Sequence, residues 1–272
     1  MTQPAAPSPH RAVSDWPFRV GLAVLGGTYV LFILALLFSI ATYAKPDGVL
    51  AVFRSPEIRY SVWLSLISCS ITALLSVWVA VPIGYVMSRY EFPGKNLLDA
   101  VLDIPIVLPP LVIGLALLVF FQTRIGRLIE SVVPITYAIP SVILAQFTVA
   151  AAFSVRVMRS TFDQISPRCE HVALTLGCNE GQAFWKVVLP QSRRGILAAG
   201  TMAWARALGE FGPVLLFAGA TRMKTEVLPT TIFLEMSVGN IEAAVAVSLI
   251  MVAVALITLI LVRVLASGEK LF

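Results

Sequence analysis

Long apolar runs dominate this chain and restrict it to a small set of folds. A helix that crosses the hydrocarbon core of a bilayer needs about 20 consecutive apolar residues. We predict a membrane-spanning helix in each of six runs, at approximately 18–43, 58–87, 97–121, 133–155, 196–218 and 243–265. The second run is longer than a perpendicular crossing requires, which indicates a tilted helix or one that extends beyond the bilayer.

The composition excludes a soluble domain of this size. Hydrophobic residues make up 58% of the 272 residues and charged residues only 13%, where about a quarter is usual for soluble proteins. We therefore predict an all-α, polytopic membrane protein with about six transmembrane helices. Its transmembrane domain is expected at residues 18–265, between a disordered cytoplasmic tail at 1–17, rich in Pro and Ala, and a short cytoplasmic tail at 266–272.

The distribution of Lys and Arg predicts the orientation of the chain, because basic loops remain on the cytoplasmic side. With the N-terminus inside, the inner segments carry twelve basic residues and the outer loops carry seven, while Arg206 lies within the fifth run. We therefore expect a multi-pass protein of the cell (inner) membrane with both termini and the loop at 156–194 in the cytoplasm. The same excess of basic residues accounts for a pI near 9.3, so the pI does not indicate a nucleic-acid partner.

The sequence contains no set of residues that predicts catalysis or a metal site. Cys169 and Cys178 lie nine positions apart, which matches no zinc-ligand spacing, and Cys69 falls within an apolar run. His10 and His171 are far apart and form no constellation with a nucleophile. The chain also lacks the GxxxxGKS/T pattern that cradles phosphates. We expect no enzyme activity, no metal and no cofactor bound by this chain.

The polar interval 166–190 is the most informative part of the sequence. Ser166-Pro167 is a typical helix start, and Gly177 is expected to end or bend the helix that follows. A second short helix is predicted from about Glu180 to Val188, with a stop at Leu189-Pro190. Two such helices would form a compact knob at the membrane surface, although the composition alone is equally typical of an amphipathic loop lying on the bilayer.

This interval resembles the coupling motif of binding-protein-dependent ABC importer permeases. In that motif a Glu-Ala-Ala triplet is followed after three residues by Gly, and after nine more by an aliphatic residue, one spacer and Leu-Pro. The matching positions here are His171, Val172, Ala173, Gly177, Val187, Leu189 and Pro190. His171 replaces the acid of the motif, and Glu170 supplies a carboxylate one position earlier. The resemblance implies docking on an ATP-binding subunit, with Glu170 alone or a titrating His171 in the polar contact.

A second resemblance narrows the family. The segment 205–212, which reads ARALGEFG, is similar to the fifth-span signature of molybdate, tungstate and sulfate permeases, and it continues into LFAG at 216–219. The sequences FPGK at 92–95 and IPIVLPP at 104–110 agree with it. These features cover about residues 58–265, so the chain is identified as resembling a type I ABC importer permease for oxyanions.

The resemblance also implies the partners. Two copies of the permease would form the pore as a homodimer in contact with membrane lipid, and each copy would seat its loop on one subunit of an ATP-binding dimer that holds ATP and Mg. An extracytoplasmic oxyanion-binding protein would deliver the anion. We expect molybdate or tungstate as the substrate, with sulfate or thiosulfate as the alternative.

Two charged residues in the fifth run admit two interpretations. Arg206 and Glu210 lie four positions apart, on one helix face, and charges within a span usually pair with each other. They either line the anion path or form an internal ion pair that braces helices, and we favour the second because Glu210 would repel an anion. Ionisable residues at midplane are also typical of transporters driven by an ion gradient, which is the alternative of another class.

The third run contains three prolines that disturb its helix. Pro105, Pro109 and Pro110 each remove a backbone donor, which a membrane tolerates only beside protein or a water-lined cavity. We predict a kinked helix at the translocation path, in preference to a kink that only improves packing.

Overall fold

The computed structural model describes residues 16–44, 52 and 54–267, and the predicted tails fall largely outside this part of the chain. The chain divides into two compact units, at residues 1–44 and 45–272. The described part of the first unit is one helix, α1 (Trp16–Tyr43), of 28 residues. At 1.5 Å per residue this helix is about 42 Å long, enough to cross a bilayer. The first predicted span is therefore confirmed.

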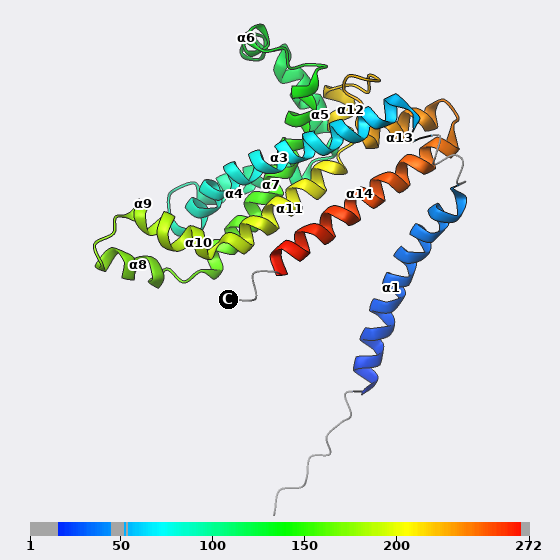
Figure 1. Ribbon diagram of the computed structural model, residues 1–272. Helices are drawn as coiled ribbons and strands as arrows, with labels where there is room; N and C mark the ends of the chain where they lie inside the picture. Colours follow the sequence, from blue (N-terminus) through cyan, green and yellow to red (C-terminus); the bar gives the residue numbers. More distant parts are fainter. Residues whose placement is uncertain (1–15, 45–51, 53, 268–272) are drawn as a thin grey trace, which may run out of the picture. The chain divides into compact units, whose positions relative to one another are not determined.

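The described residues of the second unit form helices joined by turns and short extended segments (Figure 1). The helices are α3 (Pro56–Arg89), α4 (Lys95–Val107), α5 (Pro110–Gln122), α6 (Arg124–Val132), α7 (Ile139–Gln164), α8 (Arg168–Thr175), α9 (Glu180–Ala183), the π-helical η1 (Phe184–Val188), α10 (Leu189–Gln191), α11 (Arg193–Leu208), α12 (Gly212–Phe217), α13 (Leu228–Ser237) and α14 (Ile241–Ser267). The predicted all-α fold class is confirmed.

The centre of the second unit is the packing of α3 against α7, with α11 lying along both helices. The buried face of α3 carries small polar residues at three- and four-residue spacing, namely Ser61, Ser65, Ser68, Thr72 and Ser76. Small residues at such spacing let helix backbones approach closely in a membrane protein. Thr72 also hydrogen-bonds across this interface, because its hydroxyl donates to Gln146 Oε1 at 3.3 Å.

Gly84 lets α7 approach α3 closely near the end of α3. A Cβ atom at this position would lie 2.9 Å from both the backbone nitrogen of Arg159 and the Cβ of Met158 in α7. Any larger side chain would therefore force α3 and α7 apart. This contact holds together the end of the bundle from which the polar interval projects.

The third predicted span is not one kinked helix. It consists of α4 and α5, whose axes differ in direction by 109°. Pro105 lies inside α4 without ending it, and the break falls at Leu108 and Pro109, both in an extended conformation. The reason is the proline pair, because a residue that precedes proline avoids the helical region, while Pro110 is well suited to the first position of α5.

Two other predicted spans have different boundaries in the structure. The fourth begins only at Ile139, with Pro140 in its first turn, and runs on to Gln164. The fifth is interrupted, because α11 ends at Leu208 after 16 residues and α12 begins at Gly212. Gly209 follows the end of α11, and Pro213 lies in the first turn of α12, so both residues are suited to a break.

Among the described helices, four are long and apolar enough to cross a membrane, or five if the bent pair α4 and α5 counts as one crossing. The remaining predicted span, the fifth, is divided between α11 and α12, since α11 alone has 16 residues. Figure 1 shows α8 and α9 at one end of the second unit and α6, α12 and α13 at the other. The polar interval therefore projects from one end of a helical bundle.

Candidate functional site

The polar interval folds as two short helices joined by a glycine turn. α8 ends at Thr175, and Gly177 follows with φ of +90°, a left-handed conformation that favours glycine. The Gly177 amide donates to the Leu174 carbonyl at 3.0 Å and the Cys178 amide to the Ala173 carbonyl at 3.1 Å, which is the Schellman pattern of helix ends. The predicted turn at Gly177 is therefore present.

The second short helix begins with a reciprocal cap. Asn179 Oδ1 accepts from the Gln182 amide at 2.8 Å, and Gln182 Oε1 accepts from the Asn179 amide at 3.1 Å. These two bonds satisfy backbone donors that a helix start leaves open. We call residues 166–191, which contain both short helices, the helical loop.

The helix does not stop at Leu189-Pro190 as predicted. The Leu189 amide donates to the Phe184 carbonyl five residues earlier, so η1 is a π-helical turn, and the Ser192 amide returns to the Val188 carbonyl at 3.0 Å. A proline ring inside a regular helix would clash with the carbonyl four residues before it. The wider π turn lies where that clash would occur, and the chain continues almost directly into α11.

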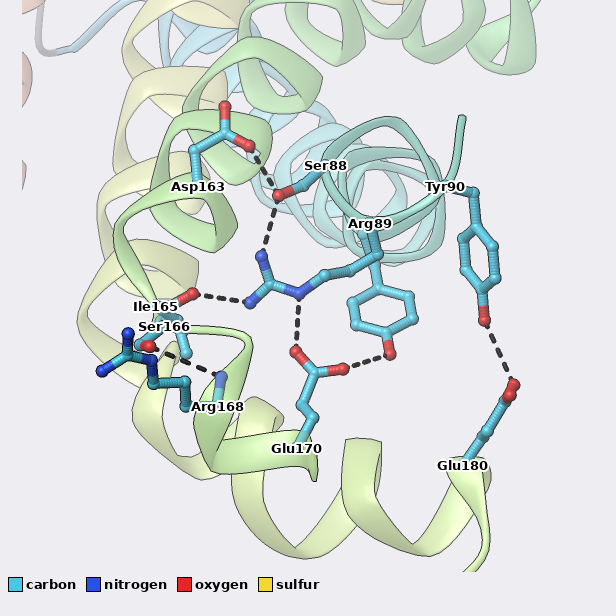
Figure 2. Close-up of polar contacts among 10 residues, drawn as sticks. Ser88, Arg89, Tyr90, Asp163, Ile165, Ser166, Arg168, Glu170 and Glu180 are labelled. Carbon is cyan, nitrogen blue, oxygen red and sulfur yellow. Dashed lines mark hydrogen bonds and ion pairs between the residues drawn. The ribbon is translucent and has the colours of Figure 1, made fainter. Parts of the chain in front are cut away.

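Glu170 lies inside a network of hydrogen bonds (Figure 2). Its Oε1 accepts from Arg89 Nε at 2.6 Å, and its Oε2 accepts from Tyr85 Oη at 2.8 Å. The Arg89 and Glu170 side chains are only 10% and 11% exposed. Arg89 Nη2 also donates to the Ile165 carbonyl at 2.8 Å, and its Nη1 donates to Ser88 Oγ at 3.2 Å.

Further contacts surround this network. Ser88 Oγ donates to Asp163 Oδ1 at 2.5 Å, which ties the end of α3 to α7. Tyr90 Oη donates to Glu180 Oε2 at 3.3 Å on the outer side (Figure 2). Partial burial, followed by the nearby Glu180 carboxylate, raises the pKa of Tyr90. The end of α3 therefore contacts both short helices of the loop as well as the end of α7.

An aromatic cluster supports the same joint. The Tyr85 ring packs edge-on against Phe162 of α7, with centroids 5.6 Å apart, and against Phe184 of η1, at 4.7 Å. Aromatic pairs in such geometry contribute beyond the area that they bury. Tyr85 thus joins α3 to α7 and η1 through its ring and to α8 through its hydroxyl.

The outer face of the helical loop is apolar and open. Val172, Leu176 and Trp185 are 57%, 80% and 67% exposed. A shallow groove of about 430 Å³ runs between α8 and η1, lined by Arg168, Cys169, Val172, Ala173, Leu176 and Val187. Large apolar side chains gathered at the tip of a projecting loop are typical of a surface that another protein covers.

The predicted loop residues therefore separate into two groups. Glu170 and Ala173 are buried, while His171, Val172, Gly177 and Pro190 are exposed, and Val187 and Leu189 lie between these extremes. The sequence interpretation missed Arg89 and Tyr85, the partners of Glu170. Their only signal is local: the two residues are four positions apart, on one face at the end of a long apolar run.

The second predicted pair lies at the end of α11. Arg206 Nη2 and Glu210 Oε1 are 2.7 Å apart, and the Glu210 side chain is 1% exposed. Within the described residues, that oxygen has no hydrogen bond of acceptable angle. The Arg206 guanidinium also lies 5.6 Å above the centre of the Phe153 ring. The two charges are neighbours within the chain, as the internal-pair interpretation expects.

The third run contains the three predicted prolines and, separately, two acidic residues of α4 that line a polar pocket. Pro109 and Pro110 are exposed at the bend, and Pro105 is partly buried within α4. On the same helix, Asp103 pairs with Arg156 of α7 at 2.6 Å, and Asp99 pairs with Arg159. These four side chains line a pocket of about 220 Å³ between α4 and α7.

Apolar helices in a bundle, with an anchored loop that projects from one end, define a multi-pass membrane protein. Residues 80–270 match the model of the family described as "Binding-protein-dependent transport system inner membrane component". The chain belongs to this family, so the predicted resemblance is confirmed.

Individual relatives agree with this assignment. The chain is 29% identical over 266 residues to the sulfate transport system permease protein CysT of Escherichia coli (strain K12), covering 94% of this chain and 96% of that protein. It is 33% identical over 245 residues to the molybdenum transport system permease protein ModB of Mycobacterium tuberculosis, covering 89% and 92%. A bacterial ABC transporter involved in the import of the acidic polysaccharide alginate has a similar fold, with a TM-score of 0.75, 16% identity and coverage of 93% and 96%.

Proposed function

We propose that this chain is the pore-forming subunit of an ATP-driven importer of an oxyanion, with molybdate or tungstate as the substrate and sulfate as the alternative. Relatives named for molybdenum and for sulfate transport align over most of the chain, at 33% and 29% identity respectively. Molybdate or tungstate is placed before sulfate because the relative named for molybdenum transport has the higher identity. ATP and Mg belong to a separate subunit, and an extracytoplasmic binding protein delivers the anion.

The observation that carries this proposal is the helical loop. Its outer face exposes Val172, Leu176 and Trp185, and an apolar helix face of this kind fits a groove on a partner subunit. In the proposed assembly the loop and both termini lie in the cytoplasm, where an ATP-binding subunit is found. Two copies of the chain then present two loops to two ATP-binding subunits.

The proposed cycle uses these parts in sequence. ATP binding brings the two ATP-binding subunits together and moves the two loops with them. Because the loop is tied to α3 and α7 through Glu170 and Arg89, the helices follow and the pore opens outward. Hydrolysis returns the helices to their first arrangement. Arg206 and Glu210 brace the end of α11 during this movement.

The proposal is tested by uptake of radiolabelled molybdate into vesicles that contain the permease, its ATP-binding subunit and its binding protein. We expect ATP-dependent uptake that unlabelled tungstate blocks and sulfate does not. A block by sulfate alone would assign the alternative substrate. Uptake that proceeds without ATP on an ion gradient would contradict the importer proposal itself.

Docking of the loop is tested at the glycine turn. Gly177→Ala places a side chain at φ of +90°, which costs about 1–2 kcal/mol for an L-residue. We expect the variant to insert into the membrane but to copurify less ATP-binding subunit. Gly181→Ala is the matched control, because its added Cβ would lie 3.6 Å from Asn179 Oδ1, an ordinary contact. Equal copurification by both variants would contradict a role for the turn in docking.

A further inference from the structure

We infer that Glu170 acts within the chain, as a positioning residue that fixes the helical loop to α3 and α7, and does not contact the partner subunit. This inference rests on the proposed function, since it concerns how movement of the loop reaches the pore. It assigns the carboxylate in the coupling interval a role different from the docking contact expected from the sequence.

The direction of the Glu170 side chain is the first argument. Both carboxylate oxygens accept hydrogen bonds from α3, one from Arg89 Nε (Figure 2) and one from Tyr85 Oη. The side chain is 11% exposed. A partner that reached this carboxylate would have to displace a charged hydrogen bond within the chain, and charged hydrogen bonds are the stronger ones.

Arg89 supplies the second argument, because it joins three elements. It is the last residue of α3, and its guanidinium donates to Glu170 of α8 and to the carbonyl of Ile165, which caps α7. A buried ion pair requires such additional bonds to offset the loss of hydration. The planar guanidinium holds these acceptors in one fixed geometry, which a single-point cation would not.

The third argument is the reach of α3. This helix runs through 34 residues, with one internal proline, Pro82, that does not end it, and it is about 50 Å long. Toward its beginning, Ser65 Oγ accepts from the Leu228 amide of α13 at 2.8 Å, and Tyr60 Oη donates to the Lys224 carbonyl at 3.1 Å. A displacement of α8 at one end of α3 is therefore carried by a continuous helix to the segment around α13 at the other.

The neighbouring residues leave docking to the outer face. His171 follows Glu170 directly but is exposed, as are Val172 of the same helix and Leu176 immediately after its end. One face of α8 is thus attached to the bundle, and the other is open to a partner. The roles of the two faces can be tested separately by mutation because different residues form them.

The experiment compares two inner variants with two outer variants in the assembled complex. The inner variants are Glu170→Gln and the double variant Arg89→Gln with Glu170→Gln, which leaves no unpaired charge and so guards against misfolding. The outer variants are His171→Ala and Trp185→Ala. Each is assayed for copurification of the ATP-binding subunit and for the amount of anion taken up per ATP hydrolysed.

We expect both inner variants to copurify the ATP-binding subunit as the wild type does, while uptake per ATP falls by about fivefold or more, the scale of typical coupling between sites. The outer variants should lose copurification, and the complexes that still assemble should keep the wild-type uptake per ATP. A loss of copurification in Glu170→Gln equal to that of the outer variants would overturn the inference, as would unchanged uptake per ATP in both inner variants.

Copurification requires no transported anion, so it tests Glu170 whichever anion the complex carries. A wild-type complex that assembles with its ATP-binding subunit but takes up no oxyanion would contradict the proposed function instead. The two failures are therefore distinguishable.

Discussion

The ion pairs Arg89–Glu170 and Arg206–Glu210 differ in the number of elements that they join. Arg89 and Glu170 are 81 positions apart and connect α3 to α8, with both carboxylate oxygens hydrogen-bonded. Arg206 and Glu210 are one helical turn apart, and Glu210 Oε1 lacks an aligned hydrogen bond within the described residues. The first pair is a joint between helices, whereas the second is a local contact at one helix end.

This difference shows that burial alone does not measure the structural role of a charge. Removing one partner from a satisfied buried pair leaves the other uncompensated, which costs about 3–5 kcal/mol. A carboxylate without aligned hydrogen bonds loses less when it is neutralised, because fewer favourable contacts disappear. The free energy of unfolding in detergent measures this contrast. Unfolding can be monitored by labelling of the buried thiol of Cys69 in protein with Cys169 and Cys178 replaced by Ser.

The largest effect is expected from Arg89→Ala. This change leaves the buried Glu170 carboxylate and the Ile165 carbonyl without their shared donor, so unfolding should become easier by about 3 kcal/mol or more. Arg124→Ala, at the exposed start of α6, is the control and should change the free energy of unfolding by less than about 0.5 kcal/mol. A similar small change for both variants would refute the role of Arg89 as a joint.

The next largest effect is expected from Gly84→Ala. The new Cβ would lie 2.9 Å from backbone and side-chain atoms of α7, and such overpacking costs about 1–3 kcal/mol. Gly200→Ala in α11 is the matched control, because its Cβ would meet only Val77 Cγ2, at 3.4 Å. There the better helix propensity of alanine should stabilise the protein by up to about 1 kcal/mol. The same sign for both changes would contradict the close approach of α3 and α7 at Gly84.

A smaller effect is expected from Glu210→Gln. The change removes one charge, while Arg206 keeps partial exposure of 31% and its position over the Phe153 ring. We expect a change in the free energy of unfolding of about 1 kcal/mol or less. Glu170→Gln, measured beside it, should cost more because it leaves Arg89 buried and unpaired. A greater loss for Glu210→Gln than for Glu170→Gln would reverse the contrast between the two pairs.

The smallest effect concerns pH at the edge of the joint. The pKa of Tyr90 is raised by partial burial and by the nearby Glu180, so folding favours the neutral phenol. The contribution of the neutral Tyr90 phenol to the free energy of unfolding is fully present below the unfolded-state pKa of about 10. It is lost as the pH rises through the higher folded-state pKa. Between pH 8 and pH 10.5 the melting temperature should fall more for the wild type than for Tyr90→Phe. Identical slopes would indicate that Tyr90 does not titrate differently on folding.

Much of the fold could be predicted from local patterns. Apolar runs located α1, α3, α7 and α14, since a bilayer requires about 20 apolar residues in each crossing. The spacing around Gly177 indicated two short helices with a turn. The sequence did not predict the angle at a helix break, because tertiary packing decides it. At Leu108 and Pro109 the axes of α4 and α5 diverge by 109°. A proline pair indicates that a helix is disturbed but not by what angle.

The candidate site was predicted only in part, for a related reason. The motif spacing identified the helical loop, and the resemblance implied a polar contact with the partner subunit through Glu170 alone or with His171. The opposite direction of that side chain depends on Arg89 and Tyr85, which lie more than eighty positions earlier in the chain. No periodicity links residues at such a separation.

By itself, the sequence determined the membrane environment, because this depends on the length of the apolar runs. It also determined the glycine turn of the loop and the pairing of Arg206 with Glu210, because each depends on residues within one or two helical turns of each other. Only the tertiary structure decided which face of α8 is attached and which is open, by what angle the third run bends, and that one arginine joins α3, α7 and α8. These features arise when helices distant in sequence pack together, and the geometry of that packing depends on the whole bundle.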